Sequence, residues 1–199
     1  MSNAIRLLLG ASAVMFGGTL LAQPKADNYF PAKKDSKWTY KVGDNTIEVR
    51  ISKVEKVGPD EHFQFDTVVG KDPKTSETML VRADGVYRSK VKDDKLDPYI
   101  KLLPLPAKKG TSWDINSKLG TQTIKGTLKV IEDAEKVTVQ GVEYTAIQVE
   151  GKDVDVAGAK TTVRIWFAKN VGIVKQEFVL ASGDKVLLEL VKGGYVEGK

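Results

Sequence analysis

Apolar and polar residues alternate with a period of two along most of the chain after residue 36. Successive side chains of a β-strand point to opposite faces, so this pattern predicts strands that each bury one face. The clearest example runs from Thr161 to Glu177, where the alternation continues on both sides of the segment Ala168 to Gly172. Two alternating runs around a short glycine-containing break predict a β-hairpin with its turn at this segment.

Turn signals rich in Gly, Asp and Asn recur roughly every 8 to 12 residues, which is typical of a sandwich or barrel. We count about ten or eleven short strands and find no convincing amphipathic helix after the first residues. The predicted fold is all-β, either a single curved antiparallel sheet (half-barrel) or a β-sandwich. Both folds require the same alternation, so the sequence leaves this choice open.

The segment from Lys92 to Lys109 interrupts the pattern. It contains Pro98, Pro104 and Pro106, and proline removes a backbone donor that a helix or a central strand needs. The residues between the prolines are too apolar for a solvated loop. We therefore predict an extended crossover that lies over one face or the rim of the sheet.

The chain divides into four predicted parts. Residues 1–22 contain Arg6 followed by an uncharged apolar run of 16 residues, the layout of a signal peptide, with cleavage after Ala22. The run is shorter than the roughly 20 residues of a membrane-spanning helix, although an uncleaved anchor is the alternative. We expect a lead-in at 23–35 that Tyr29 and Phe30 pin to the body, an all-β domain at 36–193, and a frayed tail at 194–199.

Composition narrows the compartment and the partners. The chain has no cysteine, so no disulfide and no acylated lipoprotein cysteine can form, and we expect a periplasmic or secreted protein that is not a lipoprotein. Loss of residues 1–22 removes the charge of Arg6 and lowers the net charge from +5 to +4. Lysines interspersed with carboxylates favour a solvated surface, and their excess over arginine argues against nucleic acid. We expect a monomer with no transmembrane segment after cleavage.

No residue set amounts to a catalytic signature. His62 is the single histidine and falls on an outward strand position, so we predict a plain surface residue, and a histidine-based triad or multi-histidine metal site is excluded within one chain. The acidic groups at 93–97 and 150–155 lack the spacing of a calcium loop. No glycine-rich phosphate loop or nucleophile elbow is present. We expect no enzyme, no catalytic residue, no metal site and no cofactor.

Three stretches carry a resemblance to known proteins. These are Tyr29 to Tyr40, Leu103 to Trp113, and Ile165 to Lys175. Together they resemble a loose set of uncharacterised secreted bacterial all-β proteins, in which a Trp-Tyr-Ala strand end leads through a Gly-Val-Gly turn into a Val-Lys-Gln-Glu strand. Such proteins are similar in architecture to the periplasmic lipoprotein carriers of the half-barrel type. The resemblance implies a binder of a lipid or acyl group and carries over no catalytic residue.

The expected function is therefore an exported, non-enzymatic binding module for a lipid or other hydrophobic ligand of the cell envelope. The alternative is a structural or protein-interaction component of the envelope with a self-packed core, and an enzyme of unrecognised type is third. An apolar cavity of roughly 300 Å³ or more would distinguish the first from the second.

The candidate ligand-binding residues fall into two groups. An inward set is expected to line the concave face, whereas Arg164 and Trp166 alternate with it and point the other way. For Trp166 we expect coverage by the proline-rich segment; the alternative is an open patch that faces a ligand. The inward set consists of Trp38, Tyr40, Phe63, Phe65 and Phe167.

Overall fold

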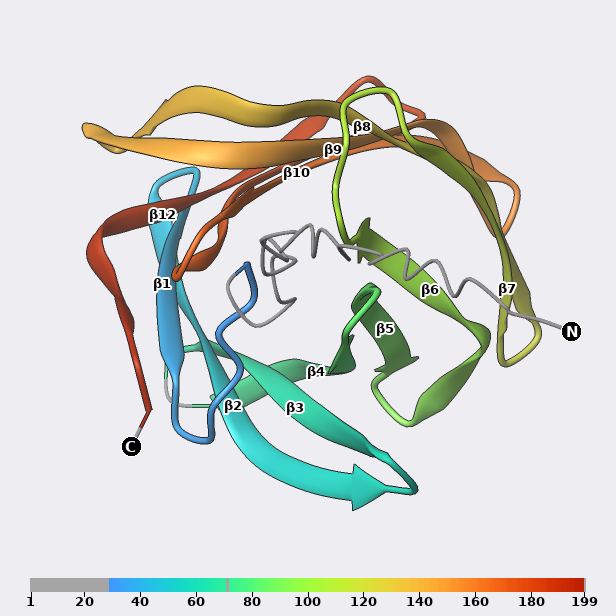
Figure 1. The fold of residues 1–199 in the computed structure, drawn as a ribbon, viewed down its shortest axis with the longest axis horizontal. Coiled ribbons are helices and arrows are strands. Elements are labelled where there is room, and N and C mark those ends of the chain that lie inside the picture. Colours follow the sequence, from blue (N-terminus) through green and yellow to red (C-terminus); the bar gives the residue numbers. More distant parts are fainter. Residues whose placement is uncertain (1–28, 71, 199) are drawn as a thin grey trace, which may run out of the picture.

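The computed structural model describes residues 29–70 and 72–198, which form a closed antiparallel β-barrel of twelve strands. Strands that follow one another in sequence are neighbours in the sheet, and β1 pairs with β12 to close it (Figure 1). The strands are β1 (Lys37–Val42), β2 (Asn45–Val57), β3 (Asp60–Val69), β4 (Asp72–Arg82), β5 (Gly85–Val91), β6 (Asp94–Pro104), β7 (Ser112–Leu119), β8 (Gln122–Val139), β9 (Val142–Val156), β10 (Ala159–Ala168), β11 (Gly172–Val179) and β12 (Lys185–Val196).

The predicted all-β class and the curved antiparallel sheet are confirmed, and the sheet curls further than a half-barrel. Closure depends on β1, in which Tyr40 lies opposite Ile47 of β2 on one side and Leu190 of β12 on the other. Closure removes the exposed edges of an open sheet, where unpaired backbone groups invite association with other chains. The longest strand, β8, spans 18 residues.

The hairpin predicted at residues 161–177 is confirmed as β10 and β11. Ile165 lies opposite Gln176, and the ladder ends at the pair Ala168 and Gly172. Gly172 has φ of +92°, which L-residues rarely adopt, and a Cβ there would lie 3.4 Å from Nε1 of Trp38. The turn therefore requires glycine both for its backbone angle and for the close approach of β1.

The proline-rich segment is a strand, so the predicted crossover is wrong. Ile100 and Leu103 of β6 are buried and pair with Arg88 and Val86 of β5. Pro98 falls at a register shift in this ladder, where a missing N–H costs no regular hydrogen bond. Local irregularity thus accommodates Pro98, whereas Pro104 is the last residue of β6 and Pro106 lies beyond it.

The boundary between β6 and β7 is the least regular of the barrel, and we call it the β6–β7 seam. Its ladder consists of two pairs, in which Leu96 and Asp97 lie opposite Leu119 and Lys118. Beyond them, side chains hold the strands together. The indole Nε1 of Trp113 donates to the carbonyl of Lys101 at 2.9 Å, and a cavity of 260 Å³ lies along the same boundary. Further along, the Ser117 hydroxyl donates to the carbonyl of Pro98 at 2.7 Å.

Replacing Trp113 by phenylalanine tests how much this side-chain bond contributes. Phenylalanine keeps a smaller aromatic ring but has no donor, so the Lys101 carbonyl loses its partner, and we expect the free energy of unfolding to fall by about 1 kcal/mol. Urea denaturation followed by far-UV circular dichroism measures the change. A variant as stable as the wild type would show that the bond contributes nothing to the seam.

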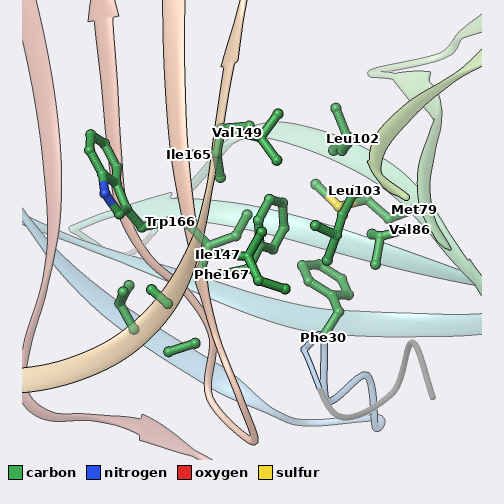
Figure 2. Close-up of a cluster of buried hydrophobic side chains, with 14 of the residues drawn as sticks. Phe30, Met79, Val86, Leu102, Leu103, Ile147, Val149, Ile165, Trp166 and Phe167 are labelled. Atoms are coloured by element: carbon green, nitrogen blue, oxygen red, sulfur yellow. The ribbon is translucent and has the colours of Figure 1, made fainter. Parts of the chain in front are cut away.

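The core fills most of the barrel, and the lead-in contributes to it. The segment before β1 enters the ring of strands (Figure 1), and Phe30 is 3% exposed, with its ring beside Met79, Val86 and Leu103 (Figure 2). Phe167, which is fully buried, belongs to the same core cluster (Figure 2). The prediction that residues 29 and 30 anchor the lead-in is confirmed for Phe30.

The C-terminal end of the chain differs from the prediction. The signal peptide and the start of the lead-in lie outside the described residues. At the other end, β12 extends to Val196, and Tyr195 stacks on Trp38 with ring centroids 5.2 Å apart, so the first residues of the predicted tail belong to the barrel. Over residues 29–70 and 72–198, no helix has the length and apolar character that a membrane crossing requires.

Candidate functional site

A cavity of 290 Å³ lies inside the barrel, and we call it the lumen cavity. Its walls come from strands at both ends of the chain, because closure brings β1, β2 and β12 beside β3, β4 and β11. This volume is close to the lower limit for a small-molecule site. The described lining residues are mostly apolar or aromatic: Phe30, Trp38, Tyr40, Ile47, Val49, Phe65, Thr67, Glu77, Met79, Arg88, Ile173, Gln176, Phe178 and Leu188.

One ion pair faces this cavity. Nη2 of Arg88 lies 3.0 Å from Oε2 of Glu77, and these are the only charged side chains among the described lining residues. Their side chains are 24% and 30% exposed, so solvent reaches this end of the cavity. Among the residues that the structure describes, none accepts a hydrogen bond from the buried Nε–H of Arg88. A buried donor without a partner is unfavourable, so a ligand oxygen placed here would gain a strong bond.

A second, larger cavity of 560 Å³ opens beside the first, and we call it the mouth cavity. Phe63 and Val81 line it from β3 and β4, together with polar residues at the ends of β2, β3 and β4. Phe30 lines both cavities. Its ring packs against Phe65 at 5.3 Å and stacks over Trp38 at 6.4 Å between centroids. Phe30 therefore stands between the mouth cavity and the lumen cavity.

Two buried donors fix one wall of the lumen cavity. Nε1 of Trp38 donates to the carbonyl of Val171 at 2.6 Å, and the hydroxyl of Tyr40 donates to the carbonyl of Ile173 at 2.8 Å. Burial raises the pKa of the Tyr40 hydroxyl far above its ordinary value, so the phenol stays neutral. These bonds tie β1 to the β10–β11 turn across the closure of the barrel and hold the aromatic wall in place.

The predicted inward residues are brought together only in part. Trp38, Tyr40 and Phe65 line the lumen cavity, and Phe63 lines the mouth cavity. Phe167 belongs to the packed core and is not among the described residues that line either cavity.

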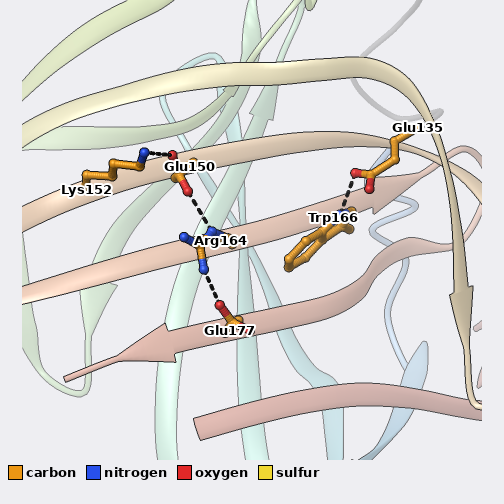
Figure 3. A network of polar contacts seen from close by, with 6 residues as sticks. All are labelled: Glu135, Glu150, Lys152, Arg164, Trp166 and Glu177. Atoms are coloured by element: carbon orange, nitrogen blue, oxygen red, sulfur yellow. Dashed lines mark hydrogen bonds and ion pairs between the residues drawn. The ribbon is translucent and has the colours of Figure 1, made fainter. Parts of the chain in front are cut away.

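Arg164 lies on the outer face, where it forms an ion-pair network (Figure 3). Its Nε donates to Glu150 at 2.6 Å and its Nη1 donates to Glu177, so one guanidinium bridges β9, β10 and β11. The hydrogen bond to Glu150 raises the pKa of Arg164. Lys152 extends the network, 3.5 Å from Glu150. The structure gives Arg164 a role in linking strands and does not bring it to either cavity.

Trp166 is 6% exposed, and a different element from the predicted one covers it. Residues 131–145, the outer part of the β8–β9 hairpin, reach past β1 and β12 in Figure 1, and we call them the β8–β9 arm. Glu135 of the arm accepts from Nε1 of Trp166 at 2.8 Å (Figure 3), and Gln140 donates to Glu189 of β12 at 2.6 Å. Lys175 lies 5.1 Å from the centroid of the indole. Coverage by the proline-rich segment is therefore wrong.

His62 is not the exposed residue that the sequence predicted. It points outward from β3 but is only 7% exposed, with Nδ1 3.3 Å from the hydroxyl of Ser89 and the ring of Tyr99 edge-on at 6.0 Å. Neighbouring strands carry large side chains on their outer faces here, and Leu80 is fully buried there. The alternation gave the correct face, but it could not show what covers that face.

Glu77 and Arg88 were not predicted from the sequence as site residues. Both occupy inward positions, since Glu77 lies opposite the inward residue Phe65, and Arg88 lies opposite Met79. A charged residue at an inward position on each of two neighbouring strands is the signal that could have found them.

Acidic groups form no metal centre in the described part of the chain: no group of three or more His, Cys, Asp or Glu side chains converges there. Asp155 instead accepts from the backbone N–H of Gly158 at 2.7 Å and pairs with Lys160 at 3.3 Å. The Gly158 bond lowers the pKa of this carboxyl. It acts as a turn residue of the β9–β10 hairpin.

Comparisons with known proteins concern the fold. No protein-family model matches the chain, and no curated protein matches it. Solved structures that are similar include a candidate exported protein with a YmcC-like fold from Bacteroides fragilis, at 11% identity and a TM-score of 0.52. A candidate lipoprotein from Parabacteroides distasonis is similar at 11% identity and a TM-score of 0.50. Each alignment covers 81% of this chain and 96% of the other. The chain is therefore similar in fold to bacterial proteins that include one of YmcC-like fold.

Proposed function

We propose that this protein is an exported, non-enzymatic binding module that holds a small amphiphile in the lumen cavity. The observation that carries the proposal is the Arg88–Glu77 pair at one side of an otherwise apolar and aromatic cavity. An apolar tail would contact Trp38, Phe65 and their neighbours, and an oxygen of the polar head would accept from Nε of Arg88. Mostly apolar walls with a few placed polar groups are typical of small-molecule sites.

Two further observations support an envelope location. The first residues of the sequence have the layout of a signal peptide, and the similar solved structures are described as an exported protein and a lipoprotein. Within the envelope, an acyl lipid or another membrane-derived amphiphile is the ligand class that matches such a cavity.

The test is native mass spectrometry of the protein purified from the periplasm or medium of the cells that make it, combined with titration of fluorescent fatty-acid probes. We expect a co-purified amphiphile and saturable probe binding. Absence of any co-purified lipid together with no probe binding would contradict the proposal and favour the alternative, a self-packed envelope component that contacts another protein.

Replacing Val49 by phenylalanine tests where the probe binds. Val49 lines the lumen cavity, so the larger ring occupies space that the ligand needs, and we expect probe affinity to fall about tenfold or more. Val196→Phe is the matched control, because Val196 is 57% exposed and lies away from the cavity. Equal probe affinity for both variants would place the ligand elsewhere.

A further inference from the structure

A further cavity lies on the outer wall of the barrel, over β2 to β6. The pairing registers place five polar residues in one row across these strands: Lys53 lies opposite Gln64, Gln64 opposite Thr78, Thr78 opposite Lys90, and Lys90 opposite Lys95. All five line one cavity of 310 Å³, which we call the outer-wall pocket. These five residues are on the outer face of the strands and do not face the lumen cavity.

The charges of this row are unbalanced. Lys90 and Lys95 are directly opposite each other, and like charges at such positions destabilise a sheet. Among the described residues, no carboxylate lies within 4.0 Å of either ammonium group, whereas Lys53 is paired with Glu55 at 3.2 Å. The pocket thus gathers three lysines and one glutamate on its lining. An anion between Lys90 and Lys95 would remove the repulsion.

The opposite side of the pocket carries a buried imidazole. His62 has Nδ1 3.3 Å from Oγ of Ser89, and that hydroxyl lies 3.2 Å from the carbonyl of Thr78. The carbonyl can only accept, so the hydroxyl donates to it and accepts from Nδ1–H. This assignment leaves Nε2 free to take up a proton. The hydroxyl of Ser89 and the ring of Tyr99 complete this side.

The charges around His62 come from every neighbouring strand. Burial lowers its pKa most, and Lys90 and Arg82 lower it further, whereas Asp60 and Glu55 raise it. The imidazole is therefore neutral at neutral pH, and a bound anion would favour its protonated form.

We propose that the outer-wall pocket binds a phosphate group, held by Lys53, Lys90 and Lys95 with His62 as a fourth donor. Ammonium groups bind phosphate as point charges, and each such contact is a charge-assisted hydrogen bond. The site is separate from the lumen cavity, so the inference goes beyond the proposed function and does not depend on it. The same chemistry could come from inorganic phosphate or from the head group of an anionic phospholipid.

The single histidine of the chain makes the test specific, because one imidazole signal in an NMR titration belongs to His62. We expect added inorganic phosphate or sulfate to raise the pKa of His62. Sulfate remains a dianion over about pH 5 to 8, the range in which histidine titrates. Its affinity for the outer-wall pocket should therefore increase as pH falls and His62 becomes protonated. If saturating phosphate or sulfate changes the pKa of His62 no more than the chloride control does, the proposal is overturned.

A paired variant provides the control. Lys90→Gln with Lys95→Gln should weaken sulfate binding about tenfold or more and raise the melting temperature in the absence of anion, since the repulsion is gone. Lys33→Gln with Lys136→Gln changes the net charge equally at lysines outside the pocket and should do neither. Equal binding by the two double variants would contradict the site.

Vesicles identify the source of the phosphate group. A lipid head group would be supported if the wild-type protein co-sediments with phosphatidylglycerol vesicles but not with phosphatidylcholine vesicles. The Lys90/Lys95 variant should then not co-sediment with phosphatidylglycerol vesicles. Response to inorganic phosphate with no co-sedimentation would support free phosphate. Failure of the lumen probes would leave both results unaffected, so the two proposals can fail separately.

Discussion

The Phe30→Ala variant is expected to unfold with a free energy about 3 kcal/mol lower than that of the wild type and to bind longer acyl chains. The stability loss follows from removing a buried aromatic ring, which leaves a cavity that the surroundings fill only partly. The change in binding follows from the position of the ring, which lines both the lumen cavity and the mouth cavity. Without it the two cavities become continuous.

Fluorescent fatty-acid probes of increasing chain length measure this effect, and guanidinium denaturation measures the stability. The wild type should prefer the shorter probes and the variant the longer ones. Phe30→Leu is the matched control, because leucine still fills the space between the cavities and should retain the preference of the wild type. An unchanged chain-length profile in Phe30→Ala would show that the ring does not limit the ligand.

The Arg164→Leu variant is expected to lose about 2 kcal/mol of stability. The guanidinium bridges Glu150 and Glu177, whose side chains are only 11% and 20% exposed. Its removal leaves Glu177 without its counter-ion and leaves Glu150 with only the exposed Lys152, 3.5 Å away. Breaking a fully buried pair costs about 3 to 5 kcal/mol, and the partial exposure of the 29%-exposed arginine reduces this through solvent screening.

A triple variant separates the loss of the arginine from the effect of leaving its carboxylate partners unpaired. Arg164→Leu combined with Glu150→Gln and Glu177→Gln removes all three charges, so no carboxylate is left uncompensated, and most of the stability should return. Urea denaturation of the wild type, the single variant and the triple variant gives the comparison. A triple variant as unstable as Arg164→Leu would show that the packing of the arginine, and not its charge, stabilises the wall.

Much of the barrel could be predicted from the sequence, because alternation is a local property. It gave the inward positions of Trp38, Tyr40 and Phe65, and the hairpin at β10 and β11. Closure could not be predicted, since it depends on the pairing of β1 with β12, and alternation is the same in an open sheet. The β6 strand was missed because proline disfavours a regular ladder and the register shift that accommodates Pro98 has no sequence signature.

The candidate site was harder to predict than the fold. The aromatic part of the lumen cavity followed from the inward positions, but Glu77 and Arg88 become partners only when β4 and β5 pair. The covering of Trp166 depends on the β8–β9 arm, in which the register of β8 shifts near Glu132 and Glu135 accepts from the indole. Such long-range packing is not encoded in the period of any single strand.

The β6–β7 seam has a consequence for the dynamics of the barrel. Local opening of a structure begins where few backbone bonds must break, and this boundary has ladder pairs only at Leu96 and Asp97. We expect the amide protons of β6 near Lys101 and of β7 near Trp113 to exchange with deuterium before those of the β10–β11 ladder. If the wall opens there first, a ligand can enter the interior from the side while Phe30 stays in place between the mouth cavity and the lumen cavity.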